Sequence, residues 1–185
     1  IGGVLDVDNW PSTIYVASVP WLREVRENAT AEAKEYVETL RGAAVKGTIR
    51  GRVPMEEFVG AEPSEFFRLD ANYYHRGFLA NERQAPLERG DAGTRAKLLD
   101  ALQKINQVAG SASPVYYAFL LADGDRLGEL IATAGRNAGV VSQALSAFGQ
   151  SVRDIVRRHY GVTVYAGGDD VLAMLPVPGA LPCAD

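Results

Sequence analysis

The chain has 185 residues, 47% of them hydrophobic, which is enough for one ordinary domain or for one domain with part of another. A net charge of −4, from 19 basic and 23 acidic side chains, gives the chain no bulk attraction for nucleic acid. The single cysteine, Cys183, excludes an internal disulfide and a cysteine-based zinc site, and no apolar run approaches the roughly twenty residues that cross a bilayer, so we expect a cytoplasmic protein without membrane contact.

Residues 1–110 are predicted to form a mainly helical and irregular region. The β-branched residues of Ile14–Ala17 favour a short strand or extended segment at its start. Good helix formers over Ala29–Val45 and an apolar stripe over Ala92–Val108 predict two helices. Between them, over residues 48–93, prolines and glycines predict irregular structure with short helices.

Residues 111–185 have a different pattern, and we place a domain boundary between 110 and 111. The run Val115–Ala122 is almost continuously apolar, as expected for a central strand buried on both faces. A short helix is expected next, followed by a longer helix with an apolar stripe over Val141–Val156. The β-formers of Val162–Leu175 flank two glycines and predict a β-hairpin.

Two acidic turns follow the predicted strands. Asp123 and Asp125 lie directly after the first strand, and Asp169 and Asp170 lie at the tip of the hairpin. Adjacent carboxylates repel each other unless a positive ion lies between them. If the two strands are neighbours, Asp123 converges with the hairpin pair on a site for Mg²⁺ or Mn²⁺. Such a site can hold two ions roughly 3.5–4 Å apart, the arrangement used for displacement at phosphorus.

Glycines accompany both acidic turns. Gly124 and Gly128 flank a turn that opens a helix, where exposed amides can cradle a triphosphate. Gly167 and Gly168 would let a nucleotide base or sugar approach the backbone closely. Each turn also has an ordinary interpretation when it is taken alone. The first is then a polar turn that caps the next helix, and the second is a solvent-exposed hairpin.

Two motifs together resemble a known family. Ala-Asp-Gly-Asp-Arg-Leu-Gly over residues 122–128 and Tyr-Ala-Gly-Gly-Asp-Asp-Val-Leu-Ala over residues 165–173 resemble the palm domain of the large subunit of type III CRISPR effector complexes, the Cas-ten family, in its type III-B (Cmr-two) branch. Trp-Pro-Ser-Thr at 10–13 and Phe-Arg-Leu-Asp at 67–70 are similar to that branch too. The resemblance implies an α+β, ferredoxin-like palm with an antiparallel sheet and helices on one face. It also implies a C-terminally incomplete palm, and we expect a piece of a longer polypeptide.

The resemblance further implies a nucleotidyltransferase that converts ATP into cyclic oligoadenylate when target RNA is bound, in antiviral defence. It would work with a guide RNA and other effector subunits. Catalysis and metal binding would fall to Asp123, Asp169 and Asp170, and the ATP pocket would be shaped by Gly124, Asp125, Gly128, Gly167 and Gly168. The His-Asp dipeptide of the nuclease domain that family members often carry does not occur in this sequence.

Two alternatives remain open at this point. The first is an enzyme similar to diguanylate cyclases, although Val171 stands where those enzymes often have an aromatic residue. The second is a non-catalytic scaffold subunit of an RNA–protein assembly, in which the acidic turns are inert. Metal-dependent ATP binding distinguishes an enzyme from a scaffold, and a preference for ATP over GTP distinguishes the two enzymes.

Overall fold

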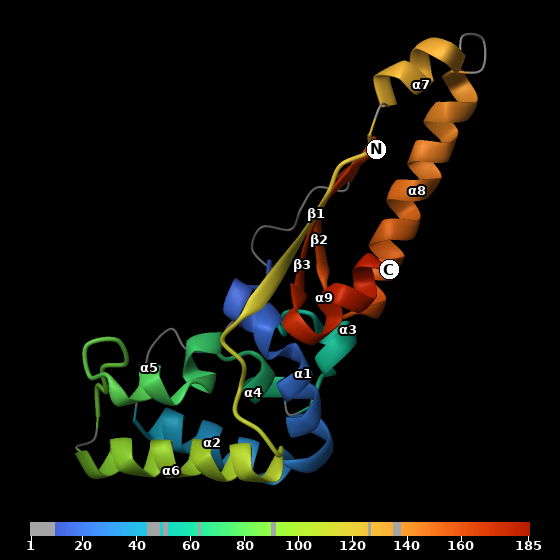
Figure 1. The fold of residues 1–185 in the computed structure, drawn as a ribbon. Helices are drawn as coiled ribbons and strands as arrows, with labels where there is room; N and C mark the ends of the chain where they lie inside the picture. The colour runs from blue at the N-terminus through green and yellow to red at the C-terminus, as the bar shows by residue number, and fades with distance from the viewer. Residues whose placement is uncertain are drawn as a thin grey trace. The chain divides into compact units, whose positions relative to one another are not determined.

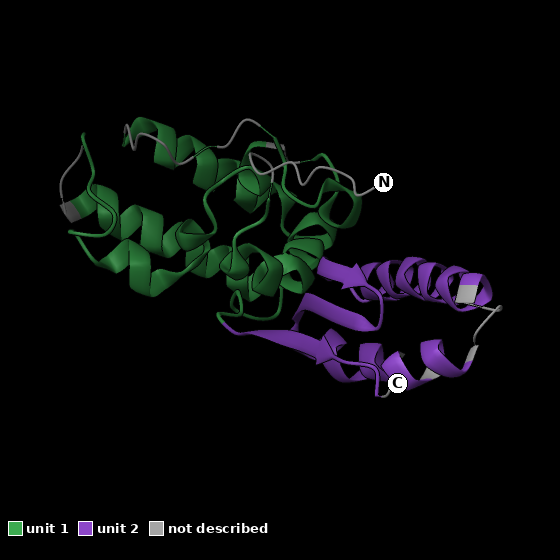
Figure 2. Cartoon of the chain, turned by 90° about the horizontal axis from the view of Figure 1, so that it is seen from above, with its two compact units in different colours: residues 1–115 green, residues 116–185 purple. Residues whose placement is uncertain are grey.

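The computed structural model describes residues 10–43, 49, 52–62, 64–89, 92–125, 127–134 and 138–185. The chain forms two compact units, residues 1–115 and 116–185, which Figure 2 distinguishes by colour. Within the described part of the chain, none of the helices combines the length and the apolar character needed to cross a membrane.

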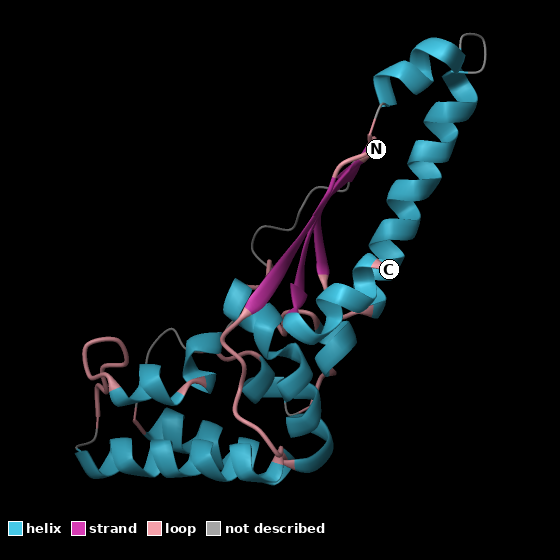
Figure 3. Ribbon diagram, in the orientation of Figure 1, coloured by secondary structure: helices cyan, strands magenta, loops and turns pink. Residues whose placement is uncertain are grey.

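The first unit consists of helices joined by loops, as the sequence predicts (Figure 3). Its longest helix, α6, has the predicted bounds. In chain order the described helices are α1 (Thr13–Asn28), α2 (Thr30–Gly42), α3 (Glu56–Val59), α4 (Ser64–Phe67), the 3₁₀ helix η2 (Ala71–Tyr74), α5 (Arg76–Ala80) and α6 (Ala92–Val108).

The start of the first unit corrects one prediction. Ile14–Ala17 lies in helix α1 and not in a strand. The side chain of Ser12 caps this helix by accepting a hydrogen bond from the amide of Tyr15 at 3.2 Å. Tyr15 is also fully buried, and its hydroxyl donates to the carbonyl of Phe67 at 2.9 Å. Capping and tertiary burial therefore override the local preference of β-branched residues for extended structure.

Aromatic side chains form the centre of the first unit. The ring of Phe66 lies 6.0 Å from Trp21, 6.1 Å from Tyr36 and 5.2 Å from Tyr74, measured between centroids. These rings are almost completely buried, and their polar atoms have partners, because Trp21 Nε1 donates to the carbonyl of Ser111 and the Tyr74 hydroxyl donates to the carbonyl of Phe66. This aromatic cluster therefore forms a closed core in which the polar atoms of the rings are hydrogen-bonded.

The second unit is an α+β domain with a three-stranded antiparallel sheet, as predicted (Figure 1). The strand order is β1-β3-β2, so β3 is the middle strand. Helices α8 and α9 pack against the sheet, and α7 contacts α8. In chain order the elements are β1 (Tyr117–Ala122), α7 (Leu127–Ala134), α8 (Ala138–Arg158), β2 (Val162–Gly167), β3 (Asp170–Pro176) and α9 (Val177–Ala184).

The prediction that the first strand is buried on both faces is wrong. In β1, Phe119 is 58% exposed and Leu121 is 77% exposed, whereas Leu120 packs against the core of the unit. The side chains of a strand alternate between its faces, so one face of β1 points to the helices and the other does not. The buried middle strand is β3, in which Ala173 and Leu175 are fully buried.

The core of the second unit is small. Among the described residues, one buried cluster consists of Val156 of α8, Ala173 and Leu175 of β3, and Cys183 of α9. These come from the sheet and from the two helices on it, so the layer between sheet and helices is what holds the unit together. The opposite face of the sheet carries the exposed side chains of β1.

Candidate metal centre

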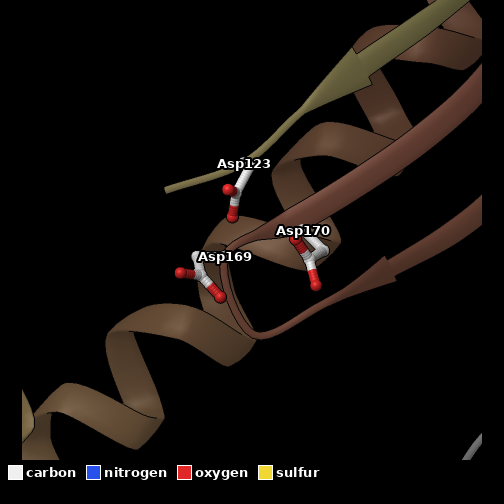
Figure 4. Close-up of side chains that lie close together, drawn as sticks. All are labelled: Asp123, Asp169 and Asp170. Atoms are coloured by element: carbon white, nitrogen blue, oxygen red, sulfur yellow. The ribbon is translucent and has the colours of Figure 1, made fainter. Parts of the chain in front are cut away.

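Three aspartates meet at the end of the sheet where the β2–β3 hairpin turns (Figure 4). Asp123 follows β1, Asp169 lies in the turn, and Asp170 is the first residue of β3. One carboxylate oxygen from each aspartate can serve as a metal ligand, and these three oxygens all lie within 4.8 Å of one another. Asp123 and Asp170 are exposed and Asp169 is half-buried, so a solvated ion can reach the cluster from outside.

Strand register explains why Asp123 meets the hairpin. Ala122 pairs with Val171, so the next position beyond β1 lies opposite Asp170. Gly167 pairs with Asp170, which leaves Gly168 and Asp169 as the two turn residues. Gly168 has a φ of +64°, the left-handed conformation that a type II′ hairpin turn requires at its first central position. The predicted convergence of strand end and hairpin is therefore present in the structure.

Gly124 has a steric role that the sequence analysis did not foresee. A Cβ atom at this position would lie 2.5 Å from the Cβ of Asp169 and 3.1 Å from one of its carboxylate oxygens. The first contact is far too short for two carbon atoms, and the Cβ of Asp169 cannot move without its backbone. The missing side chain of Gly124 thus gives Asp169 the space to approach the end of β1.

The charges of the cluster act most clearly on Asp170. The pKa of its carboxyl is raised from the ordinary value by loss of solvation, by a hydrogen bond with Asp123, and by the negative charges of Asp123 and Asp169. A hydrogen bond between two carboxyls needs a proton to share. A divalent cation can take the place of that proton, since it satisfies several carboxylate oxygens at once and removes their repulsion.

The other predicted site residues lie around the cluster in different ways. Asp125 is exposed in the turn after β1 and is not part of the three-aspartate group. Gly128 lies in α7, with nothing near the position of its missing side chain. At Gly167 that position is taken by a neighbour, because the hydroxyl oxygen of Tyr165 would lie 2.9 Å from a Cβ there. The space beside Gly167 therefore accommodates Tyr165.

Arg153 of α8 is a contact that the sequence analysis missed. Its Nη2 donates to the carbonyl of Ala166 at 2.9 Å and its Nη1 to the carbonyl of Gly149 at 3.3 Å. Ala166 comes directly before Gly167, so Arg153 ties α8 to the strand that leads into the hairpin turn. No local sequence pattern signals this contact, because it depends on how α8 packs on β2.

The order of strands and helices, with carboxylates at the hairpin end of an antiparallel sheet, defines a palm-type domain. A comparison with known families shows which palm domain it resembles. Residues 116–185 match the model of the second palm domain of Cas10/Cmr2. Residues 116–185 are thus similar to the second palm domain of Cas10/Cmr2, and the resemblance seen in the two motifs is confirmed.

A curated relative supports this assignment. The CRISPR system Cmr subunit Cmr2 of Pyrococcus furiosus is 36% identical over 101 residues. The match covers 38% of this chain and 11% of the relative, so it concerns a small part of that protein. Palm domains of this kind are generally metal-dependent, which agrees with the carboxylate cluster.

Proposed function

We propose that the palm unit is the metal-dependent nucleotidyltransferase centre of a type III CRISPR effector, and that it converts ATP into cyclic oligoadenylate when target RNA is recognised. The observation that supports this most directly is the set of three carboxylates within 4.8 Å of one another at the hairpin end of a Cas10/Cmr2 palm. Carboxylate oxygens are the ligands that Mg²⁺ and Mn²⁺ prefer.

Under this proposal Asp123, Asp169 and Asp170 hold the ions, and Gly124 keeps Asp169 within reach of Asp123. Two bound ions would lower the pKa of an attacking hydroxyl and neutralise charge on the leaving pyrophosphate. The hairpin turn at Gly167 and Gly168 would lie beside the nucleotide, with the backbone open at Gly168 and covered by Tyr165 at Gly167. Asp125 and Gly128, in the turn and helix after β1, would contribute to binding of the phosphates.

The proposed setting is a cytoplasmic assembly with other effector subunits, a guide RNA and a target RNA. The relative is named as a subunit of the Cmr CRISPR system. We also propose that the helical region and the palm are separate domains. The boundary expected from the sequence lies between 110 and 111, and the compact units divide between 115 and 116.

Calorimetric titration of ATP into the chain in the presence of Mn²⁺ tests this function. Binding is expected for the wild-type chain and is expected to be lost in the double variant Asp169→Asn/Asp170→Asn. Asp154→Asn is the matched control, because it removes an exposed carboxylate of the same unit that lies outside the cluster. Binding that is independent of the metal, or that Asp154→Asn weakens as much as the double variant does, would contradict the proposal.

Synthesis of cyclic oligoadenylate is then assayed in the complete effector complex with target RNA, for the wild type and the double variant. Product from the wild type alone supports the enzyme. An assembled complex that binds no ATP in the palm would instead support the scaffold alternative, and preference for GTP would support a diguanylate-cyclase-like enzyme.

A further inference from the structure

An aromatic side chain lies beside the three aspartates on the free face of the sheet. Tyr165 of β2 is 54% exposed, although its neighbour Ala166 is buried against the helix side. Tyr165 pairs with Leu172, and Gly167 pairs with Asp170. Directly paired residues of an antiparallel sheet share a face. Tyr165 and Asp170 therefore lie on the same face, the one that α8 and α9 leave uncovered.

Two parallel rows of side chains cross this face. Register places Leu121, Leu172 and Tyr165 in one row, because Leu172 pairs with both of the others. The next row toward the hairpin tip contains Asp170, its partner Gly167, and Asp123 at the end of β1. Rows two residues apart are roughly 7 Å apart along the strands. An apolar and aromatic row thus runs directly beside the acidic row.

Tyr165 extends toward the acidic row. A Cβ atom on Gly167 would lie 2.9 Å from its hydroxyl oxygen and 3.1 and 3.5 Å from ring carbons, so the ring covers the backbone of Gly167. The Cβ positions of a cross-strand pair are about 4.5–5.5 Å apart, which brings the edge of the ring close to Asp170. The ring is held over the glycine on one side, and more than half of the side chain is open to solvent.

We propose that Tyr165, with Leu172 and Leu121 beside it, is the platform on which the purine base of the nucleotide stacks. This inference rests on the proposed function, since it needs the triphosphate to be held through metal ions by the acidic row. A nucleotide anchored there has its base within reach of the neighbouring row. Aromatic rings bind bases of any sequence by stacking, and the apolar leucines remove the rest of the base from water.

Binding measurements with two probes separate the base from the phosphates. ATP and inorganic tripolyphosphate are titrated by calorimetry in Mn²⁺ into the 185-residue chain and its Tyr165→Ala and Tyr165→Phe variants. We expect Tyr165→Ala to bind ATP about 5- to 150-fold more weakly and tripolyphosphate as tightly as the wild type does. Tyr165→Phe keeps the ring and is expected to bind both probes normally.

Tyr116→Ala is the matched control, because Tyr116 is 77% exposed in the same unit but lies outside the row. Unchanged ATP binding by Tyr165→Ala would overturn the platform while the metal centre stands. An equal loss of ATP and tripolyphosphate binding would also overturn it, because Tyr165 would then act only through the hairpin. Failure of the wild type to bind either probe with Mn²⁺ would overturn the platform and the proposed function together.

Discussion

The two units of this chain use their large apolar side chains in opposite ways. Among the described residues, the largest fully buried side chains all belong to the helical unit: Trp21, Tyr15, Tyr36, Tyr74, Phe66, Phe67, Leu22, Leu69, Leu79, Leu98, Leu102 and Ile105. The palm unit has a small core and leaves Phe119, Leu121 and Tyr165 exposed on one face of its sheet. Large apolar surfaces that stay exposed mark sites of binding, whereas a closed core serves stability.

A pair of leucines tests this difference most strongly. Leu102 of α6 is fully buried, and Leu121 of β1 is 77% exposed. Leu102→Ala is expected to lower the free energy of unfolding by about 2–5 kcal/mol, because it leaves a cavity. Leu121→Ala is expected to change it by less than about 0.5 kcal/mol. Urea unfolding curves of both variants measure this, and a large loss in Leu121→Ala would show that its face is covered within the chain.

A pair of glycines tests how tightly the palm is packed despite its small core. A Cβ on Gly161 would lie 2.8 Å from side-chain carbons of Leu175 and Val156 and 2.9 Å from the carbonyl oxygen of Met174. Gly161→Ala is therefore expected to cost about 1–3 kcal/mol through overpacking. Gly139→Ala places a methyl group in open space in α8 and is expected to be neutral or stabilising by up to about 1 kcal/mol. Equal stability of the two variants in thermal unfolding would argue against close packing at Gly161.

A smaller effect is expected when one methyl group is added beside the three aspartates. Gly124→Ala is expected to push Asp169 away from the end of β1 and to weaken Mn²⁺ binding by about 10–100-fold, as is typical when the support of a metal ligand is lost. Gly128→Ala is the control, since its added methyl group meets nothing within 4 Å. Isothermal titration with Mn²⁺ compares the two variants. Equal affinities would mean that the contact with Gly124 does not position Asp169.

The smallest expected effect is a change in Tm when Asp170 is replaced in metal-free buffer. Its pKa is raised in the folded chain, so folding binds protons and becomes less favourable as the pH rises from the ordinary aspartate value through the raised one. At a pH above the raised pKa this cost is fully present, and Asp170→Asn removes it, so a slightly higher Tm is expected. Below the ordinary pKa of aspartate the two proteins should have the same Tm.

Thermal scans over pH check this prediction, and added Mn²⁺ should raise the Tm of the wild type more than that of Asp170→Asn. A lower Tm of Asp170→Asn at pH 7 in metal-free buffer would contradict the repulsion among the three carboxylates.

Much of the palm could be predicted from local signals. Two glycines between runs of β-formers predict a hairpin, and an apolar run ending in Asp123 predicts a strand with an acid at its end. Both predictions are confirmed. The meeting of Asp123 with Asp170 required the further assumption that the strands are neighbours. The pairing of β1 with β3 in the structure, with Ala122 opposite Val171, shows this directly.

Features that depend on contacts far apart in the sequence could not be predicted. The residues of β1 are apolar on both faces, and composition does not reveal that Phe119 and Leu121 lie on the face without helices. The role of Gly124 depends on the side chain of Asp169, which is distant in the chain. The link from Arg153 to the carbonyl of Ala166 likewise exists only once α8 lies on β2.

The register between β1 and β3 determines whether Asp123 can join the other two aspartates. Moving β1 by one residue would turn Asp123 to the helix side and Leu120 away from the core, because side chains alternate along a strand. The same register thus keeps Leu120 buried against the core and the carboxylate of Asp123 beside those of Asp169 and Asp170. An ion held by all three aspartates would in return clamp β1 in this alignment, and the amide hydrogens of β1 should then exchange with deuterium more slowly.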